Sequence, residues 1–499
     1  MVASHTLRAC DRPAALHPQW ADHPQSYRYP LWVEFIAADE VPLPPAGGTR
    51  LVSASLRSRL GRISPGREPF APFSVYSFMM KAMLVLCLPL LAYAADVSGQ
   101  WNFHIVRFGE EGDGARVELK ADGTKLTGTL NELTLEGTVD GDHLAFTLIR
   151  PNGKEWGKLT GTISGDEMSG TVKQGEDELG WNARRAPKLS TEAKTHQFEP
   201  TAFQRVFSGA IKPVLHINPG DTIKTTTVDA GGEDAKGVRR SLGGNPETGP
   251  FYVEGAMPGD TLAIKFTRIR LNRNSAGSGD RIVPSAVTPG YFRDAKFDEN
   301  FSSEWTLDHQ AGIAKLTKPT ERMKNFQVKL QPMLGCVGVA PPANQSFRAG
   351  WLGSWGGNMD YNGLREGVTV YLPVYQEGAL LFVGDGHALE GDGELNGDAL
   401  ETSMDVEFKV ELIRGKRTQG PRFESDEYLM ASGIAGSLQD ALQQATSELA
   451  RWLERDYKLS ANESNIVLGT SIRYEIAEVV DPQVHVVAKV SKAVLATLQ

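Results

Sequence analysis

Two ionisable residues follow directly on a strongly apolar run in the last third of the chain. The run Ala379–Val383 has the composition of a buried strand, and Asp385 and His387 come just after it. Because side chains two residues apart in a strand project from the same face, both groups leave the sheet together. A carboxylate and an imidazole form an ordinary zinc donor set, and Glu394 supplies a further carboxylate nearby in the sequence. Taken alone, the same Asp-Gly runs also fit hairpin turns with solvated carboxylates.

Three more segments place polar residues or glycines where apolar strands end. A desolvated carboxylate or amide costs free energy unless it is paired or bound to metal, so such residues are candidates for a site. Glycines at such points also let backbone N–H groups approach a ligand closely. The candidates are Asp229 before a glycine turn, Gly335 and Cys336 in a small-residue segment, and the pair Asn358 and Asp360.

Short alternating strands must position these residues. The segment 95–186 alternates apolar and polar residues between Asp-Gly and Asn-Gly turns, which predicts a small antiparallel β module. Within it, Leu126-Thr127-Gly128-Thr129 recurs 33 residues later as Leu159-Thr160-Gly161-Thr162, which indicates two related hairpins. The unit resembles small β-barrel modules of secreted bacterial hydrolases, and its tryptophans are expected to pack in its core.

The remainder, 198–499, is predicted to be β-rich with a small α/β portion at its C-terminal end. Strands run to about residue 415, and residues 434–457 then place leucines at helical spacing. A second short helix is expected around 464–468, and 483–490 alternates as a closing strand. The whole chain is therefore expected to be mainly β.

The first 94 residues differ in character from the rest. Residues 1–78 show no sustained periodicity and are interpreted as a mis-called upstream segment or as disordered. Residues 79–94 have the charge, apolar core and Ala-Tyr-Ala ending of a secretory signal peptide. A secreted or periplasmic location follows, with Cys336 as the one cysteine left after cleavage. The alternative is a disordered extension before a buried apolar helix.

The charge balance argues against nucleic-acid and anionic membrane partners. Acidic residues outnumber lysine and arginine 61 to 52, and neither sign forms long runs. Small neutral or cationic partners fit this surface better. After removal of the signal peptide, no membrane partner is expected.

Taken together, the candidate segments resemble the acetamidase/formamidase family in their order and amino-acid sequence, from about Phe198 to Val490. The segments that carry the resemblance are Asn218–Thr222 with Asp229-Ala230, Asn245–Ala256, the Gly335 segment, Gly357–Asp360, Gly384–His387, Gly391–Glu394 and Val479–Pro482. One departure is clear, because many members carry a histidine where this chain has Met333.

The resemblance implies a β-rich amidase that binds a divalent metal and hydrolyses small carboxamides to the acid and ammonia. Zinc is the expected ion, although a site rich in carboxylates also suits calcium. A homo-oligomer is expected from the resemblance alone. On this hypothesis the metal ligands are Asp229, Asp385 and His387, the general base is Glu394 with Glu254 in reserve, and the substrate contacts are Gly335, Cys336, Asn358 and Asp360.

Two other functions stay open at this stage. Cys336 would be the nucleophile of an amidase that forms an acyl-enzyme, although no histidine stands near it in the sequence and an unpaired cysteine among small residues is typical of a buried core. Alternatively, the chain is an exported ligand-binding protein on an inactive amidase scaffold. The presence of Asp385, His387 and Glu394 argues against such a loss of activity, whereas Met333 argues for some departure from the catalytic members of the family.

Overall fold

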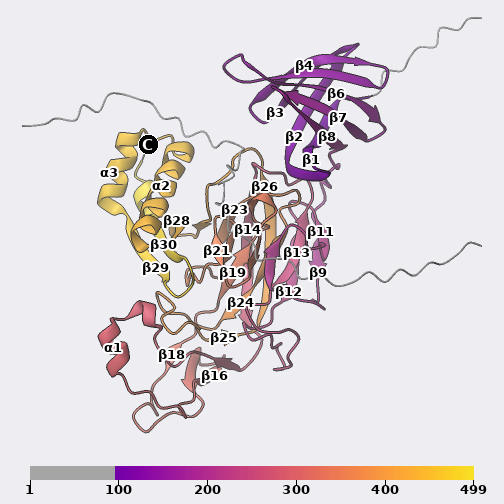
Figure 1. The fold of residues 1–499 in the computed structure, drawn as a ribbon. Helices are drawn as coiled ribbons and strands as arrows, with labels where there is room; N and C mark the ends of the chain where they lie inside the picture. The colour runs from indigo at the N-terminus through magenta and orange to yellow at the C-terminus, as the bar shows by residue number, and fades with distance from the viewer. Residues whose placement is uncertain (1–95, 499) are drawn as a thin grey trace, which may run out of the picture. The chain divides into compact units, whose positions relative to one another are not determined.

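The computed structural model describes residues 96–498 and is mainly β, as the sequence predicts (Figure 1). The proposed signal peptide, 79–94, and the segment 1–78 lie outside the described residues. Among the helices of the described part, none has the length and apolar character needed to cross a membrane.

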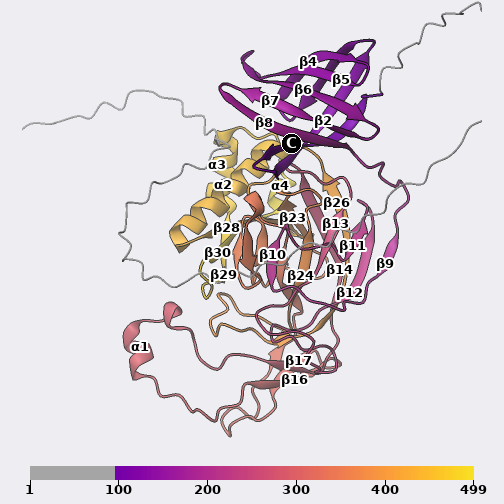
Figure 2. The ribbon, with the colours of Figure 1, turned by 45° about the vertical axis from the view of Figure 1, so that its right-hand side comes forward.

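The first strands close into an antiparallel barrel, drawn in indigo and purple in Figures 1 and 2. The repeat seen in the sequence corresponds to the hairpins β3–β4 and β6–β7. A side chain at Gly128 would meet the backbone oxygen of Glu118 on the neighbouring strand, and one at Gly170 would meet that of Thr160. The close approach of these paired strands therefore requires glycine at both positions. The strands are β1 (Gly99–Arg107), β2 (Glu110–Asp122), β3 (Lys125–Leu130), β4 (Leu133–Asp140), β5 (His143–Ile149), β6 (Glu155–Ser164), β7 (Glu167–Gln174) and β8 (Asp177–Arg185).

The aromatic residues of the barrel pack in its core, as predicted. Trp101 and Trp181 are almost fully buried, and the rings of Phe103 and Trp181 stack with their centroids 5.5 Å apart. Closure itself is a result of the tertiary structure, since β1 pairs with both β2 and β8 and no edge strand is left open.

Two larger sheets follow the barrel. An 11-stranded sheet runs in the order β18-β17-β16-β15-β25-β24-β19-β22-β21, with β13 joined to β24 and β11 joined to β13. Its strands are β11 (Leu215–Ile217), β13 (Thr248–Val253), β15 (Ser275–Gly277), β16 (Glu304–Asp308), β17 (Ile313–Leu316), β18 (Val328–Lys329), β19 (Met333–Gly338), β21 (Leu352–Gly353), β22 (Gly356–Asn358), β24 (Leu381–His387) and β25 (Glu401–Thr402).

A 9-stranded sheet has the order β29-β30-β28-β27-β23-β14-β26-β12-β9. Its strands are β9 (Thr195–Gln197), β12 (Thr222–Thr226), β14 (Thr261–Leu271), β23 (Thr369–Pro373), β26 (Met404–Ile413), β27 (Arg422–Glu424), β28 (Tyr428–Ala435), β29 (Arg473–Glu478) and β30 (Val484–Ser491). A separate two-stranded pair consists of β10 (Val206–Ser208) and β20 (Ser346–Arg348).

The two large sheets share one hydrophobic core. Phe251 of β13 packs edge-on against Phe408 of β26, with ring centroids 5.7 Å apart, and Phe408 also contacts Phe266 of β14. Strand β24 supplies Leu381, Phe382 and Val383 to the same core, all fully buried. The strand that carries the candidate site is therefore fixed by packing over its first three residues.

The C-terminal helices cover β28 and β30 (Figure 1). Helix α2 (Leu438–Asp456) begins four residues later than the predicted helix, because Ser437 accepts a hydrogen bond from the Asp440 N–H and caps it. Helix α3 (Ala461–Ser471) is longer than predicted, since Ser460 and Glu463 form a capping box. The expected closing strand is confirmed as β30. The short helices are α1 (Pro289–Asp294), α4 (Lys492–Leu495), η1 (Pro284–Ala286) and η2 (Pro342–Asn344).

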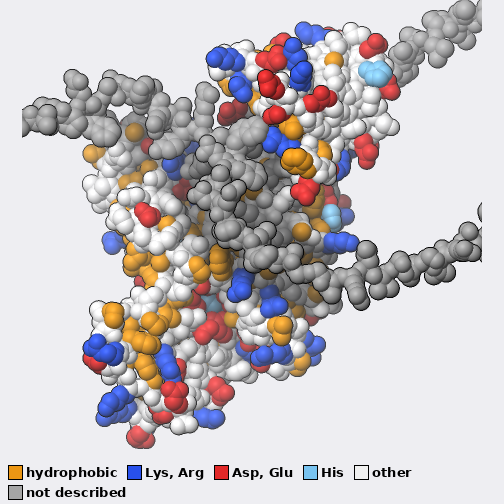
Figure 3. Space-filling view, viewed as in Figure 1, with side chains coloured by type: hydrophobic (Ala, Val, Ile, Leu, Met, Phe, Trp, Pro, Cys, Tyr) orange, Lys and Arg blue, Asp and Glu red, His pale blue; other side chains and the backbone are white. Residues whose placement is uncertain are grey.

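Acidic and basic side chains are interspersed on the face shown in Figure 3. This mixture agrees with the absence of long single-sign runs in the sequence. In and just after α1 the chain also leaves the large apolar side chains of Tyr291 and Phe297 exposed.

Candidate metal centre

The C-terminal end of β24 carries Asp385 and His387 into the protein interior. Every residue of β24 is buried, and β19 lies antiparallel beside it with Met333 opposite His387 and Cys336 opposite Gly384. Asp385 and His387 are two residues apart in the same strand, as the sequence requires for a shared face. Their side chains are 2% and 0% exposed, so any charge they carry must be balanced within the protein.

The imidazole of His387 is oriented by a carboxylate. Its Nδ1 lies 2.9 Å from Glu390 Oε2, whereas Nε2 lies 3.1 Å from Glu401 Oε1 and 3.5 Å from Asp385 Oδ2. A proton on Nδ1 that is donated to Glu390 leaves the Nε2 lone pair for a metal, which is the usual carboxylate–histidine–metal arrangement.

Two groups of donor atoms share this histidine. Asp360, His387 and Glu394 form one, and Asp385, His387 and Glu401 form the other, with the donor atoms of each group within 4.8 Å of one another. These are the imidazole and carboxylate ligands that zinc accepts, and the number of oxygens also suits calcium.

The residues present fit a divalent cation. Among the described residues, buried oxygens of Asp360, Asp385 and Glu401 have no hydrogen-bond partner, and neither has Nε2 of His387. Several ionised carboxylates in one dry cluster repel one another, and desolvation adds several kcal/mol for each unpaired ion. A divalent ion would remove both costs, so this donor set fits a divalent metal ion.

The pKa values of these groups show the same imbalance. Burial, reinforced by the surrounding carboxylates, raises the pKa of Asp360 and Glu394 well above the ordinary range, and burial raises that of Glu401 to about 8. For His387, burial lowers the pKa, but the charges of Glu401 and Asp385 outweigh it and raise the value well above 6.5. A metal ion bound here would therefore displace a proton from this cluster, and its affinity would rise with pH.

Two asparagines hold the carboxylates from outside. Asn245 Nδ2 donates to Asn358 Oδ1 at 2.7 Å and to Asp385 Oδ2 at 2.9 Å. Asn358 Nδ2 in turn donates to Asp360 Oδ2 at 2.6 Å and to Asp481 Oδ2 at 3.1 Å. These bonds leave Oδ1 of Asp360 and Oδ1 of Asp385 without partners. The amides thus fix the orientation of the acids and leave one oxygen of each for an ion.

The backbone of the cluster is strained at the same residues. Asp360, Asp385, Glu394 and Asn245 all have positive φ angles, of 38°, 54°, 46° and 52°. Left-handed backbone costs roughly 1 kcal/mol or more at such residues, and it persists where surrounding structure enforces it, often at functional sites. The concentration of four such residues around one histidine makes this cluster the leading candidate for the functional site.

Known proteins share the sequence of this region. The model of the acetamidase/formamidase family matches residues 353–494, which include Asp360, Asp385, His387, Glu394 and Glu401. The acetamidase of Mycolicibacterium smegmatis is 41% identical over 216 residues, covering 34% of this chain. This part of the chain is therefore similar in sequence to the acetamidase/formamidase family.

Solved structures named as acetamidases or formamidases are similar to part of this chain in fold. The crystal structure of a predicted acetamidase/formamidase from Thermoanaerobacter tengcongensis matches with a TM-score of 0.53 and 28% identity, over 62% of this chain and 99% of that one. Acetamidase from Bacillus halodurans matches with a TM-score of 0.51 and 25% identity, over 61% and 99%. The chain spans only 53% of the length of the Mycolicibacterium protein and 61% of that of a Schizosaccharomyces pombe relative.

Within this acetamidase/formamidase-like core, most of the predicted site residues meet. Asp385, His387 and Glu394 lie in the two donor groups, and Asp360 joins them. Asn358 contacts the cluster through Asp360, and Gly335 lies against it on β19. Buried Met333, where the sequence resemblance expects a histidine, lies opposite His387, so a thioether stands beside the one histidine of the two donor groups.

Asp229 and Glu254 are not brought to the cluster. Both oxygens of Asp229 are occupied, Oδ2 by Arg273 at 2.6 Å and Oδ1 by the Glu233 N–H at 2.8 Å. Asp229 therefore lies outside both donor groups and its charge is balanced by the arginine, an arrangement that does not favour the expected ligand role. Glu254 pairs with His216 at 2.8 Å and is likewise absent from both groups, so it is not placed to act as the base.

Three glutamates were missed by the sequence analysis. Glu401 supplies the third donor beside Asp385 and His387, and Glu390 orients the imidazole. Glu247 is fully buried, and burial together with the charge of Asp385 raises its pKa well above the ordinary value. The sequence offered a clue to two of them. Glu390 stands three residues after His387, and Glu247 lies in the family-like segment Asn245–Ala256. Nothing in the sequence pointed to Glu401, because its strand β25 has only two residues and therefore shows no periodicity.

Cys336 lies behind the cluster as a core residue. Its thiol is fully buried and donates to the Ala349 carbonyl oxygen at 3.5 Å. Burial and the nearby charges of Glu247 and Asp385 raise the pKa of the thiol well above 9. A nucleophilic cysteine needs a lowered pKa or an adjacent base to form thiolate, so this environment disfavours that role.

Gly335 gives the cluster its space. A Cβ at this position would clash with Oδ1 of Asp360 and lie 2.8 Å from Oδ2 of Asp385 and 2.9 Å from Cε1 of His387. We expect Gly335→Ala to weaken metal binding at least about ten-fold, because overpacking costs about 1–3 kcal/mol and displaces the donors. Metal content after dialysis against a graded chelator series measures the effect.

Gly350→Ala is the matched control for this substitution, because nothing lies within 4 Å of a Cβ built there. It should leave metal affinity and melting temperature unchanged. Equal metal affinity in Gly335→Ala and the unsubstituted protein would show that Gly335 is not needed for the donor geometry.

Proposed function

We propose that this chain is a metal-dependent amidohydrolase that converts small linear carboxamides to the carboxylic acid and ammonia. The observation that carries the proposal is the buried imidazole of His387, which is shared by two groups of donor atoms and whose Nε2 faces the carboxylates of Asp385 and Glu401. The names of the family and of the matched relatives supply the substrate class.

Asp385, His387 and Glu401 are proposed to hold the ion, most suitably zinc. They include the one nitrogen donor of the cluster and take ligands from the adjacent strands β24 and β25. When bound, the ion supplies a Lewis acid that polarises the amide carbonyl and lowers the pKa of bound water. Glu390 keeps the imidazole in the tautomer that presents Nε2.

Glu394 is proposed to carry the proton. It is 7% exposed, and its carboxylate lies in the donor group of Asp360 and His387, which shares His387 with the proposed ligands. Burial raises its pKa well above the ordinary value, which makes it a better proton acceptor than an exposed glutamate when the charge of a bound cation keeps it ionised. Its Oε1 also accepts a hydrogen bond from the Ala399 N–H, which fixes its position.

Asp360 and its two amides are proposed to form the wall where substrate is placed. The carboxylate of Asp360 is held by Asn358, and Asn245 links Asn358 to Asp385. Carboxylate oxygens accept hydrogen bonds, so Asp360 suits the N–H₂ group of a primary amide. This role favours unsubstituted amides over N-alkylated ones, which present fewer donors.

Ammonia release from formamide, acetamide and longer primary amides tests the function, with metal analysis of the same sample. We expect release that is lost on chelation and restored by zinc. Cys336→Ala is the companion variant, and it should retain turnover because the thiol is buried and protonated. A fully metallated Cys336→Ala protein without turnover would support the nucleophilic cysteine, and a metallated protein inactive on the entire panel would support a binding protein.

A further inference from the structure

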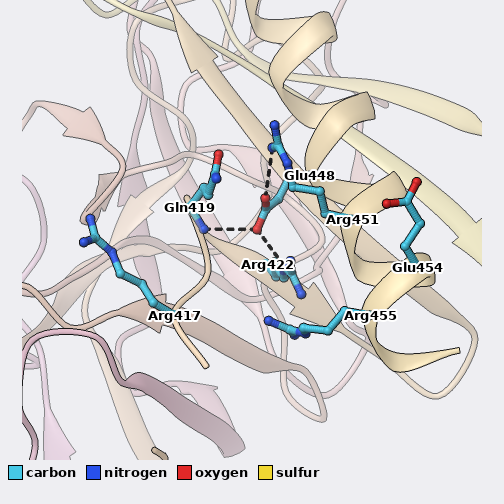
Figure 4. Close-up of a pocket in the computed structure, with 7 residues that line it drawn as sticks. All are labelled: Arg417, Gln419, Arg422, Glu448, Arg451, Glu454 and Arg455. Atoms are coloured by element: carbon cyan, nitrogen blue, oxygen red, sulfur yellow. Dashed lines mark hydrogen bonds and ion pairs between the residues drawn. The ribbon is translucent and has the colours of Figure 1, made fainter. Parts of the chain in front are cut away.

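A pocket lined by arginines lies between β27, the chain just before it, and helix α2. It has a volume of about 390 Å³, and the charged residues on its walls are Arg417, Arg422, Arg451 and Arg455 together with Glu448 and Glu454 (Figure 4). None of these residues belongs to the metal centre. Four arginines against two glutamates leave the walls with a net positive charge.

Arg422 is the buried centre of this arrangement. Its side chain is 4% exposed, its Nε donates to Glu448 Oε1 at 2.7 Å, and its guanidinium lies over the Trp452 ring at 4.8 Å. Neither Nη1 nor Nη2 bonds to another described residue, and Nη1 is fully buried without a partner. A buried guanidinium with unused N–H groups is costly, so a further acceptor at this place would stabilise it.

The glutamates leave this charge only partly balanced. Glu448 already accepts from Arg422 and from the Gln419 N–H at 3.2 Å, and Arg451 Nη1 stands 3.6 Å from its other oxygen (Figure 4). Burial lowers the pKa of Arg422 although the charge of Glu448 raises it, so the pair does not fully compensate the desolvation of the arginine.

Two more arginines of the pocket have N–H groups that can donate hydrogen bonds to a ligand. The Arg417 guanidinium lies 4.5 Å from the Tyr375 ring centroid, and within the described part of the chain it has no hydrogen-bond or ion-pair partner. Arg455 pairs with the neighbouring Asp456 at 2.7 Å and is about one-third exposed. The carbonyl end of α2 contributes about half a negative charge, which these guanidinium groups outweigh.

We propose that this arginine pocket binds the phosphate group of a small ligand, at a site separate from the metal centre. A phosphate presents several acceptor oxygens with up to two negative charges, which matches unused guanidinium donors on several sides. The volume exceeds that of inorganic phosphate, so a phosphomonoester also fits. The proposal does not rest on the amidase function.

Isothermal titration of the full chain with inorganic phosphate, and separately with glycerol 3-phosphate, tests the proposal at constant ionic strength in a phosphate-free buffer. We expect saturable binding of at least one of them. Arg417→Gln and Arg455→Gln should each weaken it about ten-fold, since each removes a positive charge and charge-assisted hydrogen bonds to the phosphate oxygens. Glu454→Gln should tighten it, because it removes a negative charge from the wall. Tighter binding of the ester identifies a phosphorylated metabolite, and equal binding identifies the phosphate group alone.

Arg293→Gln is the matched control, because Arg293 pairs with its neighbour Asp294 as Arg455 pairs with Asp456, but far from the pocket in sequence. It should bind phosphate as the unsubstituted protein does. The proposal is overturned if neither ligand binds saturably, if Arg293→Gln weakens binding as much as Arg417→Gln, or if the pocket variants leave binding unchanged, as phosphate bound at the metal centre would.

Discussion

Replacement of His387 by alanine is expected to remove bound metal and amide hydrolysis together. The imidazole is the one nitrogen donor shared by both donor groups, and Glu390 holds it in the tautomer that presents Nε2. A metal contributes several kcal/mol to transition-state stabilisation, and each 1.4 kcal/mol is ten-fold in rate, so we expect a loss of turnover of at least about 1,000-fold. Metal content by atomic emission and ammonia release measure the two effects.

The loss of metal should also destabilise the protein. Without the ion, His387→Ala leaves buried carboxylates such as Asp385 and Asp360 unbalanced, so the melting temperature should fall and then recover in part as the pH is lowered and these acids take up protons. His104→Ala is the control, because it removes a buried histidine of the barrel. It should keep full metal content. Retention of metal and turnover by His387→Ala would contradict the proposed site.

Glu394→Gln is expected to abolish turnover while the metal stays bound, whereas Glu401→Gln should lose the metal. The two substitutions remove the same charge from the same cluster, so each serves as the control of the other. Loss of a general base costs about 10²–10⁴ in rate. Loss of a ligand from a three-donor set lowers affinity by more than the 10–100-fold seen for outer-shell partners. Metal content at a fixed chelator concentration, with single-turnover rates, separates the two outcomes.

The reverse outcome has a defined meaning. If Glu394→Gln loses the metal and Glu401→Gln keeps it, the ion belongs to the group of Asp360, His387 and Glu394, and Glu401 is the proton carrier. If both variants lose the metal, both groups contribute ligands to one ion or to a pair of ions. Metal stoichiometry of the unsubstituted protein distinguishes these last two arrangements.

The amino-acid sequence determined the parts of this protein that depend on local pattern. Alternation over 95–186 and 198–415 predicted the mainly β fold, and leucine spacing predicted α2, because both periods follow from backbone geometry. The two-residue spacing of Asp385 and His387 likewise placed both on one buried face at the end of an apolar strand. Glycine turns and small residues marked the candidate segments, since close backbone approach requires them.

The tertiary structure alone decided which carboxylates meet His387. Asp229 follows the short strand β12 and Glu401 begins the two-residue strand β25, and no local sequence pattern distinguishes the two as ligands. Pairing of β24 with β25 brings Glu401 to the imidazole, whereas the carboxylate of Asp229 is held in an ion pair with Arg273. The closure of the barrel, the space left by Gly335 and the arginine pocket were decided in the same way. Each depends on the register of segments far apart in the chain, which is set by how the whole core packs and not by the period of any one strand.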